Sequence, residues 1–317
     1  RQYGAPEVLR LAEVEKPTPG EDELLVSVRA TTVNVGDCRM RSFTVPAIFW
    51  LPGRISLGLT RPRQPVFGME LAGVVEAVGK DVKQFKPGDP VFASTLAENF
   101  GAHAEYKCLR EDGAVVKKPQ AVSDEEAAAL PISANTALSF LRAANIRPGQ
   151  KVLVNGAAGG VGAFAVQLAG YFGAEVTAVC GPANQGLAQS LGAARVLDYT
   201  RVDFTRTGET YHIIFDAVGK TTFARCKNAL KRDGYFLETV MVAATLQGRW
   251  AELTTGKHIV GGTARPDKAG LAFLAELVAA GKLKVMIDRR YPLERIAEAH
   301  RYVETGHKKG NVVINVG

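Results

Sequence analysis

The sequence predicts an α/β protein in which a β-rich first part is followed by a doubly wound parallel sheet. Three observations support this. From residue 123 onward, short apolar strands alternate with helices, the pattern of a parallel sheet with crossover helices. One of these strands, 152–155, runs through a glycine-rich turn into a helix. Residues 1–122 instead carry short strands separated by proline and glycine, which favours a small barrel.

In the first part we expect strands at 24–30, 71–78 and 91–93, with a turn at 86–89 before the last of them. Residues 43–59 are apolar and are predicted to form a long loop.

That loop would line a hydrophobic substrate pocket, with Phe43, Phe49 and Trp50 as its walls. Packing against its own domain or against a partner subunit is the alternative. A position at a membrane surface, helped by neighbouring arginines, is a third reading.

In the second part, Ser123 and Glu126 form a predicted capping box that starts a helix. The predicted strands of the parallel sheet are 152–155, 175–179, 195–197, 212–216 and 235–239. The remaining predicted elements are helices at 161–172, 269–280 and 292–304 and a last strand at 311–316.

Composition excludes several classes of protein. The 317 residues are 46% hydrophobic and 22% charged, as in a globular protein of roughly two domains. No apolar run reaches the ~18 residues of a membrane span. Despite the net charge of +7, basic residues are mixed with acidic ones outside Arg54, Arg61 and Arg63, so we expect no nucleic-acid partner. Four widely spaced cysteines favour reduced thiols and a cytoplasmic location.

Residues 152–162 read Val-Leu-Val-Asn-Gly-Ala-Ala-Gly-Gly-Val-Gly. Glycines let the backbone approach a pyrophosphate, and the amides and dipole of the helix N-terminus attract it. We therefore expect Gly159, Gly160 and Val161 to bind a dinucleotide. The match is imperfect because Ala157 replaces the first glycine of G-x-G-x-x-G, and a tight strand-to-helix turn is the alternative.

Seven segments, in order and spacing, resemble the quinone oxidoreductase-like proteins, the zinc-free branch of the medium-chain dehydrogenases/reductases. These segments are 3–9, 32–37, 68–75, 85–89, 130–131, 135–137 and 215–219, together with the glycine loop. The resemblance implies a GroES-like barrel from residues 1–122 and the returning segment 263–317. It implies a Rossmann domain at 123–262 and an active site between the two domains.

The resemblance also assigns roles to residues. Asn34 would lie near the nicotinamide ribose or the substrate oxygen, where its amide polarises a carbonyl or quinone; a turn-stabilising asparagine is the alternative. Thr136 would contact the nicotinamide and Asn311 the cofactor. Related enoyl thioester reductases carry a tyrosine proton donor where this chain has Phe43 and Val45. Cys38 and Tyr106 are the remaining donor candidates, so a quinone or reactive enone is the expected acceptor.

The identity of the cofactor depends on the end of the second strand. NAD-specific enzymes place an acid there, about 20 residues after the glycine motif, but this chain has Cys180. A 2′-phosphate would meet no repulsion, so NADP(H) is favoured over NAD(H), with dual use left open. Relatives often add an arginine or lysine after this strand. Here the amides after Gly181, the side chain of Asn184 and that of Tyr199 would hold the phosphate.

We expect no metal. Zinc relatives carry Gly-His-Glu where this chain has Gly68-Met69-Glu70, and a cysteine where it has Asn34. Cys38 with His103 would make only two ligands of the three that catalytic zinc needs. The remaining histidines are expected to be structural at 212 and 258 and to lie on the surface at 300 and 307.

The expected function is therefore a zinc-independent, NADPH-dependent oxidoreductase that transfers hydride to a small hydrophobic quinone or α,β-unsaturated carbonyl, in a homodimer. A metal-free alcohol or aldehyde oxidoreductase is the alternative enzyme. A nucleotide-binding protein with little catalysis is the alternative of a different class.

Overall fold

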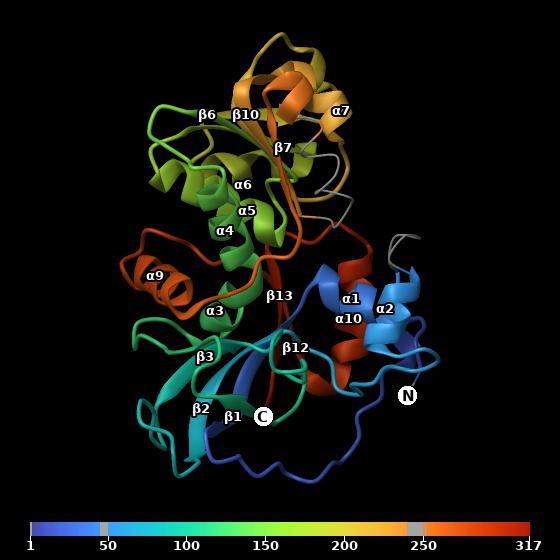
Figure 1. Cartoon of the computed structure of the whole chain (residues 1–317), viewed down its shortest axis with the longest axis vertical. Helices are drawn as coiled ribbons and strands as arrows, with labels where there is room; N and C mark the ends of the chain where they lie inside the picture. Colours follow the sequence, from blue (N-terminus) through green and yellow to red (C-terminus); the bar gives the residue numbers. More distant parts are fainter. Residues whose placement is uncertain (1, 45–49, 240–249, 251) are drawn as a thin grey trace. The chain divides into compact units, whose positions relative to one another are not determined.

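The computed structural model describes residues 2–44, 50–239, 250 and 252–317. Figure 1 shows the chain, which forms two compact units. The first unit consists of Arg1–Ile132, Pro266–Ala279 and Ile287–Gly317, and the second of Ser133–Arg265 and Ala280–Met286. Relative to the expected boundaries, residues 123–132 lie with the first unit, and residues 263–265 and 280–286 lie with the second. The first difference arises because helix α3 (Asp124–Ala128) packs against strands of the first unit.

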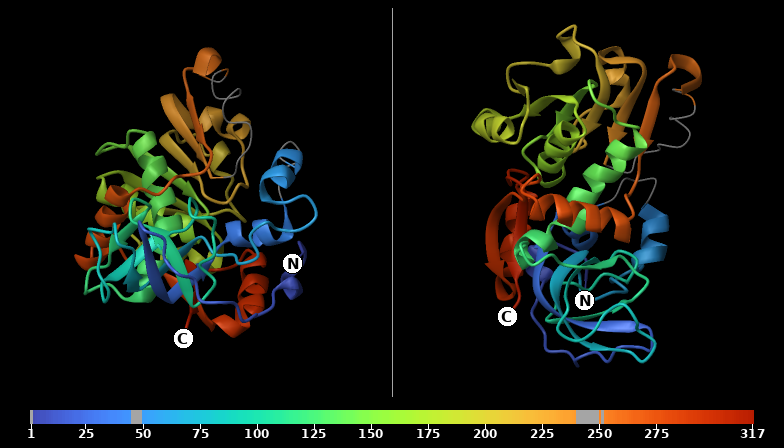
Figure 2. Two further views of the ribbon diagram at one scale, coloured as in Figure 1. Left: turned by 60° about the horizontal axis from the view of Figure 1, so that its bottom comes forward. Right: turned by 90° about the vertical axis from the view of Figure 1, so that its left-hand side faces the viewer.

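The first unit is built around a seven-stranded sheet. Its strands are β1 (Glu23–Val33), β2 (Glu70–Val78), β3 (Pro90–Ser94), β4 (Tyr106–Arg110), β5 (Val115–Lys117), β12 (Ile287–Pro292) and β13 (Asn311–Asn315). The long strand β1 pairs with β2, and it also pairs with β4 over its first half and β13 over its second half. This split pairing bends the sheet around an apolar core, and Figure 2 shows the C-terminal strand returning to it. The predicted small barrel thus includes the C-terminal segment.

Helices and short turns of the first unit pack around this sheet. They are η1 (Pro6–Val8), α1 (Val35–Ser42), α2 (Trp50–Leu57), α3, α9 (Lys268–Ala279), η7 (Leu293–Arg295) and α10 (Ile296–Glu304). Helix α1 follows β1 directly and packs against α10.

The prediction of an uninterrupted loop over 43–59 was wrong, because residues 50–57 form helix α2. Pro52 lies in the first turn of that helix, where its missing N–H costs no hydrogen bond. Gly58, at φ +124°, ends it in a conformation that other residues rarely adopt. Residues 45–49, and with them Phe49, lie outside the described part of the chain.

The second unit is the predicted doubly wound sheet. Its strands are β6 (Lys151–Asn155), β7 (Glu175–Cys180), β8 (Arg195–Asp198), β9 (Tyr211–Asp216), β10 (Leu230–Glu238) and β11 (His258–Gly261). All the recorded pairings are parallel, in the order β11-β10-β9-β6-β7-β8. The strand order reverses between β6 and β9, which is where such sheets bind ligands.

The connections of the second unit are mainly helical, as the alternating pattern predicted. They are α4 (Asn135–Ala143), α5 (Gly160–Tyr171), η4 (Pro182–Asn184), α6 (Gln185–Ser190), η5 (Phe204–Arg206), α7 (Phe223–Cys226) and η6 (Lys227–Ala229). A π-helical turn, η3 (Leu130–Ala134), carries the chain from the first unit into α4. Within the described residues, no helix combines the length and apolar character needed to cross a bilayer.

Candidate active site

The glycine loop between β6 and α5 depends on two glycines for its shape. Gly156 has φ +80°, and a Cβ there would lie 2.3 Å from Cγ1 of Val218. A Cβ on Gly162 would lie 2.0 Å from the Gly156 carbonyl oxygen. Both positions therefore exclude a side chain, and they bring the first turn of α5 close to the end of β6.

Gly159 differs from these two, because space is open around it. It is the N-cap of α5, with ordinary extended angles, and a Cβ there would meet only the Gly156 oxygen, at 3.5 Å. The N–H groups of Gly160 and Val161 begin the helix, where they have no acceptor inside it. Open space beside unpaired amides at a helix N-terminus fits a pyrophosphate.

Asp216 holds the loops at the point where the strand order reverses. It is fully buried, and Oδ1 accepts hydrogen bonds from Asn155 Nδ2 at 3.0 Å and Val218 N at 3.2 Å. Its Oδ2 accepts from Thr221 N at 3.0 Å. The carboxylate thus fixes the ends of β6 and β9 beside the glycine loop. The sequence showed Asp216 only as part of a family segment, without this role.

Next to β6, the end of β7 brings together most of the residues expected around the adenosine. Cys180 is 3% exposed, and its carbonyl accepts from Tyr199 N at 3.3 Å. A Cβ on Gly181 would lie 3.3 Å from Tyr199 Oη, so the ring of Tyr199 lies against that glycine. Tyr199 is 62% exposed. Asn184 Oδ1 has no hydrogen-bond partner among the described residues.

Two charged residues here, Asp198 and Arg201, were not among the expected site residues. Asp198 lies opposite Cys180 in the β7–β8 ladder. Its Oδ1 accepts from Thr200 N and Oγ1 at 2.9 and 2.8 Å, and these bonds lower the pKa of its carboxyl. Arg201, which is exposed, lies 3.9 Å from Asp198 Oδ2. The site therefore has an acid that is already paired and a nearby guanidinium that reaches solvent.

Thr136 lies in the first turn of α4 and is partly exposed. Its neighbour Asn135 is 1% exposed, and neither amide atom of Asn135 has a partner among the described residues. Such unsatisfied groups are rare in protein interiors and mark places where a ligand can complete the bonding.

In the first unit, Asn34 ends β1 and caps α1. Its Oδ1 accepts from Gly36 N at 2.8 Å and Asp37 N at 3.2 Å, and Asp37 Oδ2 accepts from Asn34 N at 2.9 Å. This capping box is the turn-stabilising role that the sequence left as an alternative. It uses only the amide oxygen, since Asn34 Nδ2 has no partner among the described residues.

At the positions where zinc-binding relatives carry their ligands, this chain has side chains of other types. Met69 packs its Sδ against Gly36, 3.2 Å from where a Cβ would lie. Buried Glu70 accepts from Thr32 Oγ1 and, at 2.7 Å, from Ile132 N, and burial raises the pKa of its carboxyl to about 8. A thioether, a capping amide and an engaged carboxyl are a poor donor set for zinc. In the part of the chain that the structure describes, no three His, Cys, Asp or Glu side chains are placed to hold a metal.

Cys38 and His300 form a buried pair beneath α1. Cys38 Sγ lies 3.5 Å from His300 Nδ1, and burial raises the pKa of the thiol to about 12. His300 is fully buried, and burial lowers the pKa of its imidazole to about 2. The surface position expected for His300 was wrong, because helix α10 turns this residue inward against α1.

Neither candidate proton donor suits that role. The raised pKa of the Cys38 thiol makes it a weak acid. Tyr106 pairs with Ser27 on β1, seven residues before Asn34, which is roughly 20 Å along an extended strand.

Phe43 and Trp50, expected in a substrate pocket, instead surround Arg54. The guanidinium carbon of Arg54 lies 4.0 Å from the ring centroid of Phe43, 4.5 Å from that of Tyr3 and 5.3 Å from that of Trp50. This aromatic cluster holds α2 to the end of α1. Asn311, expected at the cofactor, begins β13 and is 3% exposed.

Comparisons with known proteins agree with this architecture. Residues 20–120 match the family described as alcohol dehydrogenase GroES-like domain, and residues 191–314 match the one described as zinc-binding dehydrogenase. The chain is 32% identical to a chloroplastic quinone-oxidoreductase homolog of Spinacia oleracea, over 98% of this chain and 95% of that one. It is 30% identical to a chloroplastic NADPH-dependent alkenal/one oxidoreductase of Arabidopsis thaliana, over 98% and 77%. The quinone oxidoreductase structure from Coxiella burnetii has a TM-score of 0.89 at 28% identity, covering 100% and 97%.

Proposed function

Because the chain belongs to the quinone oxidoreductase-like medium-chain dehydrogenases/reductases and is an NAD(P)H-dependent oxidoreductase, we propose that it reduces quinones or α,β-unsaturated carbonyls with NADPH and without zinc. The observation that carries this proposal is the buried amide nitrogen of Asn34, which has no hydrogen-bond partner among the described residues. A neutral N–H donor stabilises negative charge that develops on an acceptor oxygen, without a metal.

NADPH, when bound, would supply the hydride. The chain's contribution is to hold it and to exclude water. Gly159, Gly160 and Val161 would bind the pyrophosphate, Thr136 would contact the nicotinamide, and Asn311 would contact the cofactor from the C-terminal segment. Around the adenosine ribose, Cys180 stands where NAD-specific enzymes place an acid. An acid there would repel a 2′-phosphate, and Cys180 would not. Gly181, Asn184 and Tyr199 would surround that phosphate. Arg201 adds a positive charge that the sequence argument lacked.

The nature of the acceptor follows from the poor proton donors. Cys38 is buried with a raised pKa, and Tyr106 lies far along β1 from Asn34. An acceptor that needs little proton help, such as a quinone or a reactive enone, suits this site better than an enoyl thioester. The final proton would come from water. Assembly as a homodimer in the cytoplasm completes the proposal.

Turnover separates the proposal from its alternatives. We expect NADPH oxidation with 1,4-benzoquinone and with a vinyl ketone, and little reduction of NADP⁺ by simple alcohols. Faster alcohol oxidation would favour the metal-free alcohol or aldehyde enzyme. Tight NADPH binding without turnover of either acceptor would favour a nucleotide-binding protein with little catalysis.

A further inference from the structure

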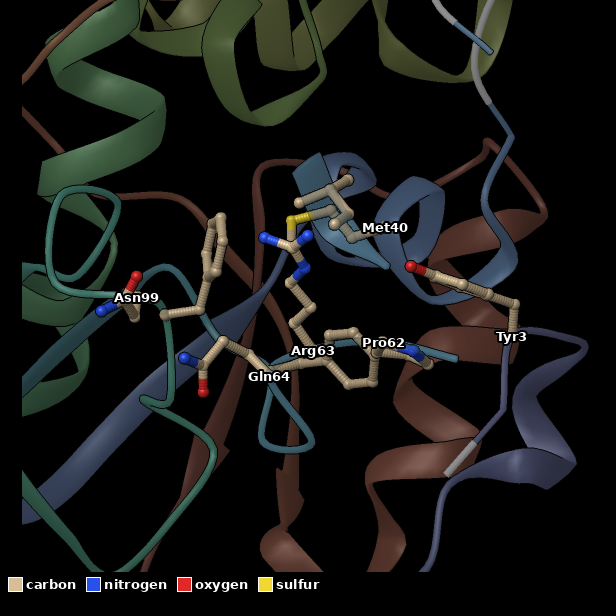
Figure 3. Close-up of a pocket in the computed structure, with 9 residues that line it drawn as sticks. Tyr3, Met40, Pro62, Arg63, Gln64 and Asn99 are labelled. Atoms are coloured by element: carbon tan, nitrogen blue, oxygen red, sulfur yellow. The ribbon is translucent and has the colours of Figure 1, made fainter. Parts of the chain in front are cut away.

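A small cavity of about 210 Å³ lies within the first unit, between the C-terminal end of α1 and the segment that follows α2. Its apolar walls include Met40, Leu57 and Phe67, and its polar groups, at the side open to solvent, are the exposed residues Arg63, Gln64 and Asn99. Figure 3 shows the Arg63 side chain extending into the middle of this group, with its guanidinium on the Met40 side.

Arg63 is the charged group of this cavity, and no ion pair of its side chain is found among the described residues. Its backbone is fixed, because Arg63 N donates to Leu57 O at 2.8 Å. The surrounding segment adds no negative charge, since residues 38–69 contain five arginines and no acidic residue. Arg41 pairs with Glu304, and Arg54 lies among aromatic rings. Arg63 is therefore free to meet an anion.

The opposite wall of the cavity is held in a strained conformation. Phe100 has a φ value of +62°, in the left-handed region that bulky residues avoid, whereas Asn99, at +57°, is of a type that tolerates this region. The turn is kept in place by Phe100 N, which donates to Thr95 O at 2.9 Å, and by Lys107 Nζ, which donates to Glu98 O at 2.8 Å. Strain that the surroundings enforce in this way is concentrated at ligand sites.

We propose that this cavity binds the carboxylate end of the electron acceptor, with Arg63 as the residue that selects it. This inference rests on the proposed reductase function. A guanidinium fork matches the two oxygens of a carboxylate, and the amides of Gln64 and Asn99 supply further donors. The single positive charge of Arg63 neutralises a monoanion but not a dianion. A carboxylate is therefore favoured over a phosphate. The apolar walls would contact the chain that carries it.

The spacing of Asn34 and Met40 along α1 gives the length that an acceptor would need in order to reach both Asn34 and the cavity. Asn34 caps the start of α1, and Met40 lies six residues later near its end. At 1.5 Å per residue the two are separated by about 9 Å along the helix axis. The inferred acceptor is therefore an amphiphile, with a reducible enone or quinone separated by several carbons from its carboxylate.

Binding of hexanoate, with 1-hexanol as the neutral probe, tests the cavity by calorimetric titration. We expect the protein to prefer hexanoate, and Arg63→Gln to weaken hexanoate binding by about tenfold and remove the preference. Arg61→Gln is the matched control, because Arg61 is exposed and charged like Arg63 but lies outside the cavity lining. Equal binding of hexanol and hexanoate, or equal losses in the two variants, would overturn the proposal.

A kinetic pair tests whether the carboxylate belongs to the acceptor. The substrates are a vinyl ketone with a terminal carboxylate and the methyl ester of the same compound. Arg63→Gln should raise KM about tenfold for the acid, leave KM for the ester unchanged and leave kcat unchanged for both. Equal KM changes for acid and ester would refute the assignment. Turnover of benzoquinone by the unmodified protein tests the proposed function separately.

Discussion

A carboxamide offers one acceptor and one donor, and Asn34 uses only its acceptor within the described chain. The oxygen caps α1 through Gly36 N and Asp37 N, while Nδ2 has no partner there. The two roles that the sequence treated as alternatives, turn stabilisation and catalysis, are therefore compatible. They depend on different atoms of the same side chain, so a substitution can separate them.

Asn34→Asp is that substitution. Aspartate caps a helix about as well as asparagine, so the unfolding temperature should change little. The variant lacks the N–H donor and adds a charge that opposes a developing oxyanion, so kcat/KM with benzoquinone should fall by about 100-fold. Asn34→Ala is the control that loses both the helix cap and the N–H donor. Its free energy of unfolding should therefore also fall, by about 1 kcal/mol. Full activity in Asn34→Asp would remove the amide from the mechanism.

Gly159→Asp should separate cofactor binding from folding. The space around a Cβ at Gly159 is open, and an aspartate N-cap stabilises a helix. We expect an unchanged or higher unfolding temperature together with severe loss of NADPH affinity, because the carboxylate would occupy and repel the pyrophosphate space. Gly162→Ala is the contrast, since its Cβ would lie 2.0 Å from a carbonyl oxygen and must destabilise the loop. Unchanged NADPH titration in folded Gly159→Asp would reduce the loop to a structural turn.

The burial of His300 predicts that the free energy of unfolding depends on pH. Burial lowers the pKa of its imidazole to about 2, below the unfolded value of ~6.5. Between these two values the unfolded chain binds a proton that the folded chain does not, so stability is lost as the pH falls below about 6.5. His300→Phe keeps an aromatic ring beside Cys38 and removes this proton uptake.

The free energy of unfolding measured from pH 7 to 4 should therefore fall less steeply in His300→Phe, by up to ~1.4 kcal/mol per pH unit. His307→Gln, at an exposed histidine, should leave the slope as it is. Identical slopes in His300→Phe and the unmodified protein would contradict the burial argument.

At the scale of elements, periodicity and turn residues predicted most of the parallel sheet. The expected helix 161–172 is α5 (Gly160–Tyr171), and the expected strand 175–179 is β7 (Glu175–Cys180). The capping box of Ser123 and Glu126 is present. These features depend on neighbours in sequence, so local patterns suffice to find them.

Elements that depend on distant contacts were missed. Helix α2 has an ordinary apolar sequence with a proline and a glycine, and it is held by Arg54 among rings that include Tyr3 and Phe43. The short strand β5 (Val115–Lys117) exists through its pairing with β3. For the candidate site, the sequence predicts roles for the glycine loop and Asn34 that stay predictions. It could not reveal the cavity at Arg63, since Tyr3, Arg63 and Asn99 meet only in the folded unit.

The turn that follows β8 should set the preference between the two nicotinamide cofactors. It presents Tyr199 and Arg201 near the end of β7, and the Asp198 carboxylate there is already engaged by Thr200. We expect NADPH to bind more tightly than NADH by about five- to thirtyfold, which is ~1–2 kcal/mol.

Arg201→Gln should reduce NADPH affinity severalfold and leave NADH affinity unchanged. Arg206→Gln is a matched control, because Arg206 is exposed like Arg201. Arg206 lies 3.8 Å from Asp203, and Arg201 lies 3.9 Å from Asp198. If the two variants lose NADPH affinity equally, the loss results from the change in net charge and not from a contact of Arg201 with the cofactor. Tighter binding of NADH by the unmodified protein would refute the cofactor assignment.

At the scale of the whole molecule, each of the two units holds its own group of candidate site residues. The parallel sheet places the glycine loop where its strand order reverses, and the bent sheet places Asn34 between the end of β1 and the start of α1. Local hydrogen bonds hold each part in its shape: those of Asp216 hold the first and those of Asp37 the second.

Metal analysis of the purified protein should therefore find far less than one zinc per chain, and EDTA should leave turnover of benzoquinone intact. The reason lies in the donor atoms: Asn34 uses its oxygen as a cap, Met69 offers a thioether, and Glu70 is held by Thr32 and Ile132. Zinc sites need thiolate, imidazole or carboxylate groups that are free to bind. Asn34→Cys with Met69→His would restore two of these ligands, and we expect it to gain zinc affinity while losing activity with quinones. One zinc per chain in the unmodified protein, with activity lost on chelation, would overturn the assignment of Asn34 as the group that stabilises the acceptor oxygen.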